Sequence, residues 1–273
     1  MTNTRTTPII SWMVGVLGAL VLLSVIISTA VSASATLTRT TTTYNANATG
    51  ISSLHVNASA TKFDVVFADV DQAELETINM RPDAWSLERR GDELRVDRRA
   101  NWELWCWFGG CGWDNSHVIL TLPEDLNDGG LAATLHQSAG ELTADGDFKK
   151  LDLDISAGAI TVTGSAEELS TNVSAGEANI DVNGVKTADL DVSAGSVDAR
   201  LTGEPPHMIR VDVSAGEATL RVPDVAYDVT QRRVSAGELQ SRVQEASNSR
   251  HKITVDLSAG SATILPDSSA SDF

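Results

Sequence analysis

The tripeptide Ser-Ala-Gly occurs seven times in this 273-residue chain, and its spacing constrains the fold more than any other feature. Consecutive copies are separated by 18, 18, 19, 21, 21 and 23 residues. A period of this length is typical of repeat proteins, in which each unit stacks on its neighbours. The repeats begin at Ser138, Ser156, Ser174, Ser193, Ser214, Ser235 and Ser258.

The residues on either side of the motif alternate between apolar and polar, as in half-buried strands. Before the serine the apolar residues lie mostly one and three positions away, and after it they lie four and six positions away. The apolar residues thus change from odd to even distances from the serine, which requires a bend or bulge because the side chains of a strand alternate strictly between two faces. Glycine permits the unusual backbone or close approach that such a corner needs. The corner glycines are Gly140, Gly158, Gly176, Gly195, Gly216, Gly237 and Gly260.

Coils of about 18–23 residues with two inward-facing strands are too short for a hairpin with its own core. We therefore predict an all-β, single-chain β-solenoid over residues 131–265, in which successive coils pair at about 4.8 Å and the glycines form a column. The alternative is a β-sandwich whose strands share the motif by chance. Arg232 and Ser241 occupy inward positions, which indicates that the C-terminal coils become irregular or form a cap. Residues 51–130 are predicted to form irregular first coils and a Trp/Cys capping hairpin.

The ends of the chain differ in composition from its centre. Residues 8–33 are apolar and contain no charged residue, and about 20 such residues span a bilayer as a helix. We predict a transmembrane anchor there, with residues 1–7 cytoplasmic and the rest of the chain extracytoplasmic. A signal peptide cleaved near Ala33 or Ala35 is the competing interpretation. Residues 34–50 are predicted to be a Ser/Thr-rich stalk and residues 266–273 a disordered tail.

The recurring "VSAG" and "LDVSAG" corners behind an apolar N-terminal segment resemble the putative-adhesin, or toast-rack, domains of unknown function found in bacterial envelopes. The resemblance covers roughly residues 50–265. It implies a β-solenoid in an extracytoplasmic, membrane-tethered module involved in adhesion or envelope sensing. It supplies no catalytic residues, and the tryptophan-rich segment described next is not part of its pattern.

The segment "NWELWCWFGGCGWDN" contains both cysteines of the chain, Cys106 and Cys111. Outside the cytoplasm, two cysteines this close are predicted to form a disulfide. A zinc site would need two more ligands, and only His117 lies nearby in the sequence. Four tryptophans in the segment predict either a plug over the N-terminal end of the solenoid or an exposed platform for a glycan, a protein or the membrane surface. They are Trp102, Trp105, Trp107 and Trp113.

Two rows of charged residues are candidate surfaces if the repeats stack in register. Arg200, Arg221 and Arg242 would form a stripe able to bind an anionic polymer, unless Asp198, Glu217 and Glu238 neutralise it. A row of acidic and amide residues would form either a solvated face or a ladder of calcium ligands, although calcium needs six to eight oxygens. This second row is Asp154, Asn172, Asp191, Asp212 and Asp256.

The composition argues against several functions. A net charge of −17 disfavours a nucleic-acid partner. The five histidines are scattered, and no nucleophile triad or phosphate-binding glycine loop occurs, so we predict no enzymatic activity, no metal and no cofactor. The expected function is binding or structural support at the cell envelope, with an envelope protein or glycan as partner. A regulatory module that senses envelope stress and a polysaccharide-cleaving solenoid are the alternatives.

Overall fold

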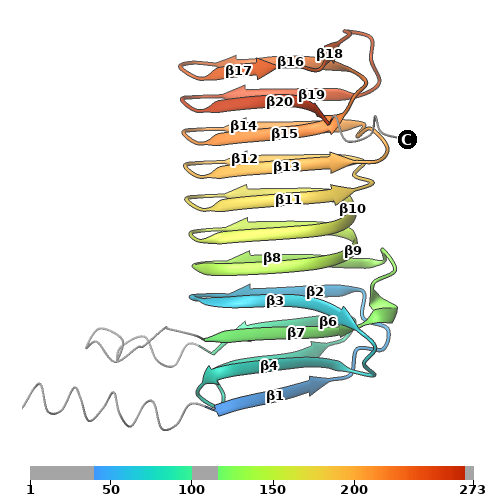
Figure 1. Cartoon of the computed structure of the whole chain (residues 1–273), viewed down its shortest axis with the longest axis vertical. Helices are drawn as coiled ribbons and strands as arrows, with labels where there is room; N and C mark the ends of the chain where they lie inside the picture. The colour runs from blue at the N-terminus through green and yellow to red at the C-terminus, as the bar shows by residue number, and fades with distance from the viewer. Residues whose placement is uncertain (1–39, 100–115, 268–273) are drawn as a thin grey trace, which may run out of the picture.

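The computed structural model describes residues 40–99 and 116–267, which are almost entirely β-strands and the turns between them (Figure 1). The predicted anchor at residues 8–33 and the segment containing both cysteines lie outside these ranges. No helix in the described part of the chain is long and apolar enough to cross a membrane.

The strands wind into a flattened solenoid with two parallel faces. In each regular coil, the residues before the Ser-Ala-Gly corner lie on one face and the residues after it lie on the other. Neighbouring coils pair in register, so that Ile160 lies between Leu142 and Ala178 of the coils on either side. These coils consist of β8 (Leu131–Gln137), β9 (Gly140–Ile155), β10 (Ala159–Val173), β11 (Glu177–Asn183), β12 (Thr187–Val192), β13 (Ser196–Thr202), β14 (Met208–Val213) and β15 (Glu217–Pro223).

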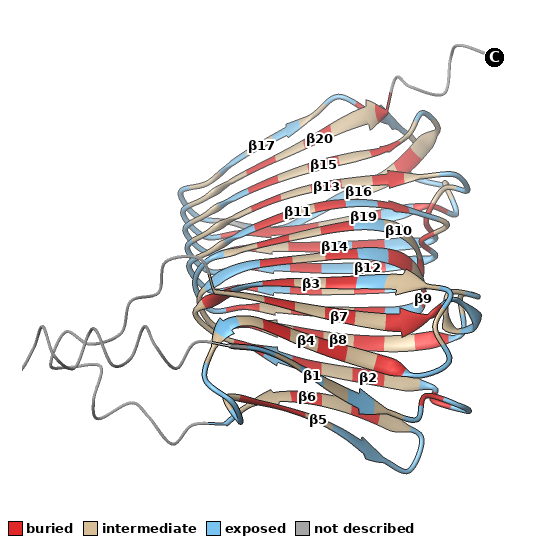
Figure 2. Ribbon diagram, turned by 60° about the horizontal axis from the view of Figure 1, so that its bottom comes forward, coloured by how far each residue is buried: buried red, intermediate tan, exposed pale blue. Residues whose placement is uncertain are grey.

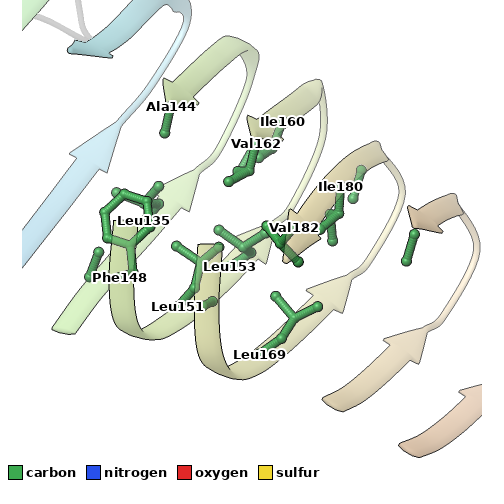
Figure 3. Close-up of a cluster of buried hydrophobic side chains, with 14 of the residues drawn as sticks. Leu135, Ala144, Phe148, Leu151, Leu153, Ile160, Val162, Leu169, Ile180 and Val182 are labelled. Carbon is green, nitrogen blue, oxygen red and sulfur yellow. The ribbon is translucent and has the colours of Figure 1, made fainter. Parts of the chain in front are cut away.

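The predicted change of parity at the corner is confirmed. Leu153 and Ile155 before the corner, and Ile160 and Val162 after it, are completely buried, whereas Asp154 between the first two is not. Alternating bands of buried and exposed residues run along the strands (Figure 2). Aliphatic side chains from both faces meet between them (Figure 3). Burial of these side chains stabilises the fold by about 25 cal/mol per Å² of apolar surface.

The corner glycines form a column because each backbone touches the next. A Cβ atom built on Gly176 would lie 2.5 Å from the carbonyl oxygen of Gly158, and the other corner glycines meet a neighbouring glycine in the same way, except Gly140, which meets the backbone of Thr61. The backbone ladder continues through the corner, where Ser174 N–H donates to Ile155 O (2.8 Å) and Ala175 N–H to Ser156 O (3.1 Å). A side chain at the glycine position would therefore force two coils apart.

The C-terminal coils do not stack in sequence order. They comprise β16 (Ala226–Val234), β17 (Glu238–Ser241), β18 (Gln244–Glu245), β19 (Lys252–Leu257) and β20 (Ser261–Asp267). Strand β19 pairs with β14 on one side and with β16 on the other, and β20 lies between β15 and β17 in the same way (Figure 1). The coil of Ser258 thus lies between the coils of Ser214 and Ser235. Our prediction that every coil stacks on the one before it is wrong at this end.

The interchange has a physical reason in the residues of the last two coils. Arg232 is exposed in the outermost coil, where a bulge between Gln231 and Arg233 takes it out of the inward row expected from the sequence. The coil inserted beneath it has fully apolar inward positions, including the buried Val255 and Ile264. An outermost coil is covered on one side only, so a polar side chain there is desolvated less than one in the middle of the stack. The prediction of an end coil at Arg232 and Ser241 is therefore correct, but this coil is not the last in the sequence.

The N-terminal end shows the same interchange. Strand β2 (Ser53–Ala58) lies between β6 (Glu93–Arg98) and β8, and β3 (Thr61–Ala68) lies between β7 (His117–Pro123) and β9. The coil that comes first along the chain is thus second in space. A short 3₁₀ turn at Glu124–Leu126 connects β7 to β8.

Antiparallel strands close the N-terminal end of the solenoid, beyond the coil of β6 and β7. Strand β4 (Ala73–Met80) pairs with β7, β1 (Thr40–Ala46) pairs with β4, and β5 (Trp85–Arg90) pairs with β6. Trp85 is buried there against Phe63, with 5.5 Å between the ring centroids. Strand β1 begins inside the range predicted as a stalk. Threonine favours strands, and the threonine run at residues 40–43 finds a partner in β4.

Candidate binding surfaces

The row of Ser-Ala-Gly corners forms one edge of the solenoid, with its serine and alanine side chains largely exposed. A shallow, open groove with a volume of about 560 Å³ follows this edge over four coils. Because the corner glycines carry no side chain, their backbone lies at the groove surface. The lining residues are Ala194, Gly195, Ser196, Ala215, Gly216, Glu217, Ala236, Glu238, Ala259, Gly260 and Ser261.

Glutamate alternates with a small residue at the first position after each corner glycine. The register pairs place these residues side by side along the axis. Glutamates on every second coil are about 10 Å apart, since parallel strands are about 4.8 Å apart. In spatial order the row is Glu141, Ala159, Glu177, Ser196, Glu217, Ser261 and Glu238. Only the interchanged order separates Glu217 from Glu238, because a sequential stack would make them neighbours.

The three arginines proposed as a stripe do not lie on adjacent coils. Arg200 and Arg221 are neighbours, but Leu265 follows Arg221 in the register and separates it from Arg242. Arg200 pairs with Asp181 (3.0 Å) and with Asp267 (3.3 Å), whose side chain is only 10% exposed. Arg221 pairs with Asp198. Acidic neighbours thus compensate two of the three arginines, and hydrogen bonding to Asp267 and Asp181 raises the pKa of Arg200.

The acidic row on the opposite face does form a ladder. Asp191, Asp212 and Asp256 occupy adjacent coils, and Arg233 follows Asp256 at the end. Burial raises the pKa of Asp191, as do the Asp212 and Asp189 carboxylates to a lesser degree. Within residues 40–99 and 116–267, no group of three or more His, Cys, Asp or Glu side chains is arranged to hold a metal ion.

A polar cluster that the sequence did not reveal lies at the N-terminal part of the corner edge. His117 Nε2 lies 2.6 Å from Asp64 Oδ2, and both side chains are about three-quarters buried. The Thr61 hydroxyl donates to the Ser116 carbonyl (3.1 Å). Thr61, Ser116 and His117 border an open depression of about 650 Å³. No sequence pattern links Asp64 to His117, because they come together only when β7 pairs with β3 through the interchange of coils.

The proposed disulfide between Cys106 and Cys111 and the platform of Trp102, Trp105, Trp107 and Trp113 lie outside the described residues. The segment that contains them connects the end of β6 to the start of β7. Strands β6 and β7 lie on opposite faces, since β6 pairs with β2 and β7 pairs with β3. Both predictions stay open.

No family model and no curated protein matches the sequence. Among solved structures, the chain is similar to a putative adhesin from Bacteroides fragilis, with 10% identity, a TM-score of 0.47 and coverage of 84% of this chain and 97% of that one. A putative adhesin from Parabacteroides distasonis has 14% identity, a TM-score of 0.43 and coverage of 84% and 98%. A putative cell adhesion protein from Clostridium sporogenes has 12% identity, a TM-score of 0.39 and coverage of 84% and 100%.

Proposed function

We propose that this chain is an adhesin-like binding module of the cell envelope, anchored by residues 8–33 with its solenoid on the extracytoplasmic side. The apolar composition of residues 8–33 supports the anchor, and the family resemblance supports the location. The stacked coils support the role, since they give the molecule long faces of regular backbone on which repeated groups recur at a fixed spacing. Extended solenoid surfaces are used for binding in other repeat proteins.

The groove along the corner edge is the observation that carries this proposal. It is shallow and crosses four coils, so it suits an extended partner better than a compact small molecule, which proteins usually enclose. Glu217 and Glu238 line it two coils apart, and Glu177 continues the row. An extended protein or glycan that presents positive groups about 10 Å apart would complement these carboxylates.

The groove favours binding over catalysis. Its polar side chains, those of Ser196, Ser261, Glu217 and Glu238, are carboxylates and hydroxyls on an open surface. Enzymes hold their reacting groups in sites that exclude water, where electrostatic interactions are strong.

The experiment is to immobilise the full chain in detergent and to measure what it retains from envelope protein and cell-wall polysaccharide fractions. We expect the double variant Glu217→Gln/Glu238→Gln to lose most of the retained material. The matched control is Glu168→Gln/Asp189→Asn, which removes the same charge from exposed residues on the opposite face. Equal retention by the two variants, or no retention by the unchanged chain, would contradict the proposal.

A further inference from the structure

The last coil of the sequence is held between two others. In a solenoid stacked in sequence order, the final coil has a neighbour on one side only, so it is the first to detach when its end is pulled. Here β19 is hydrogen-bonded to both β14 and β16, and β20 to both β15 and β17. Among the described residues, the coil with one neighbour is the preceding one, which contains β16 and β17.

The connections that produce this order are tied into the fold. The chain passes from β15 to β16 through Asp224 and Val225, and the buried Tyr227 hydroxyl donates to the Pro223 carbonyl (3.2 Å). On the return, Ala246 N–H donates to Tyr227 O (2.8 Å) and the Ser249 hydroxyl donates to Ala226 O (2.7 Å).

His251 fixes the point at which the returning chain enters the stack. Its side chain is buried, and its Nδ1–H donates to the Pro206 carbonyl (2.8 Å), which can only accept. Its backbone carbonyl accepts from Asp228 N–H (2.8 Å) of the outermost coil. His251 therefore joins the coil beneath the insertion, through its ring, to the coil above it, through its backbone carbonyl.

We propose that this interchange is a mechanical lock, which lets the solenoid carry tension without unravelling from its C-terminal end. A pull on the chain end must remove β19 and β20 from two ladders at once. The outermost coil then loses its only neighbour, so two coils have to leave together. In the account of function above, a partner in the corner groove would load these same coils. The role of the lock in holding a bound partner rests on the proposed function, whereas the resistance of the solenoid to unravelling does not.

The N-terminal end is built in the same way. Strand β1 has one partner, β4, and can detach from the edge. The chain then enters the coil of β2 and β3, which lies between the coil of β6 and β7 and the coil of β8 and β9. Unravelling from either terminus thus meets a coil that is paired on both sides.

The test is single-molecule stretching of the full chain, attached at its N-terminus and pulled from one of two points. One point is the C-terminal residue, Phe273. The matched control is an attachment peptide inserted after Ser247, which is exposed in the outermost coil. In both geometries β1 detaches from its edge, and the first event after this detachment is the one compared. From Phe273 we expect a first event that releases residues 226–267 together, roughly 140 Å of chain, and from Ser247 an event at lower force that releases roughly 75 Å.

A first event from Phe273 that releases only residues 252–267, roughly 55 Å, would overturn the proposal. So would equal first forces from the two points. Hydrogen exchange of the unmodified chain gives a second test that needs no inserted peptide. Backbone amides of β19 and β20 should exchange more slowly than those of β16 and β17, and the reverse order would refute the lock. Neither measurement uses a ligand, so both are independent of the binding assay.

Discussion

Replacing Gly195 by alanine tests why the corner motif requires glycine. A Cβ atom at this position would overlap the carbonyl oxygen of Gly176 and would lie 2.6 Å from Cγ1 of Val173. Both neighbours belong to the adjacent coil. Gly195 does not have the positive φ that disfavours other residues, so the expected effect is steric rather than conformational.

The size of the expected destabilisation follows from how far the two coils must move. Removing the overlap requires the two coils to separate by about 1 Å, and overpacking of this kind costs about 1–3 kcal/mol. The same movement stretches the hydrogen bonds from Ser196 N–H to Gly176 O (3.0 Å) and from Ala194 N–H to Ser174 O (2.9 Å). Each contributes about 1 kcal/mol. We therefore expect Gly195→Ala to lower the free energy of unfolding by about 3–5 kcal/mol.

The assay is denaturant unfolding of the full chain, with midpoints compared at equal m-values. The control is Gly184→Ala at the opposite edge, where φ is +77° but no atom lies within 4 Å of the added Cβ. Its cost is that of a left-handed residue alone, about 1–2 kcal/mol. If Gly184→Ala destabilised the chain as much as Gly195→Ala, close contact between coils would not be the reason for the glycine column.

Three further substitutions test local electrostatics and the connections. Asp191→Asn should raise the thermal unfolding midpoint at pH 7, because the raised pKa of Asp191 means that its charge opposes folding. This gain in stability should disappear as the pH falls through the pKa of Asp191 in the folded chain. An unchanged midpoint at pH 7 would contradict the argument. Asp267→Asn should cost more stability than Asp198→Asn, since the Asp267 carboxylate is 10% exposed and that of Asp198 is 47% exposed; thermal unfolding ranks them, and the opposite order would refute this. His251→Phe should lower stability by about 1–3 kcal/mol by leaving the Pro206 carbonyl unpaired, a loss that an unchanged thermal midpoint would exclude.

The two inward-facing rows and the corner between them could be predicted because they follow from local geometry. Ile155 and Ile160 have the wrong parity for one straight strand, and a corner at Gly158 removes the conflict. The turn between β5 and β6 is local in the same sense, since it lies at Gly91 and Asp92 and Gly91 has a φ of +69°.

The order of the end coils could not be predicted in this way. A parallel ladder forms the same backbone hydrogen bonds with any coil of matching length, so the choice of neighbour depends on a few side chains. Arg232 and Ser241 predict an end coil, but they do not show that the coil of Val255 and Ile264 lies beneath it. The proposed arginine stripe failed for this reason, because Leu265 separates Arg221 from Arg242.

Strand β1 was also missed, because its range was predicted to be a stalk. The threonine run of β1 has the low complexity of a linker, and only its antiparallel partner β4 makes it a strand. The contact between His117 and Asp64 depends on the same long-range pairing at the N-terminal end. Both features arise from tertiary structure that overrides local sequence pattern.

Disulfide trapping tests the interchanged order of the coils most directly. In a chain whose native cysteines are replaced by serine, one variant carries Thr219→Cys with Thr263→Cys, and the other carries Thr219→Cys with Gln240→Cys. Thr219 lies beside Thr263, and Gln240 lies one coil further away. Adjacent strands are close enough for a disulfide, whereas strands two coils apart, about 10 Å, are not. The structure predicts a cross-link between residues 219 and 263 and none between 219 and 240, and the opposite result would show that the coils stack in sequence order.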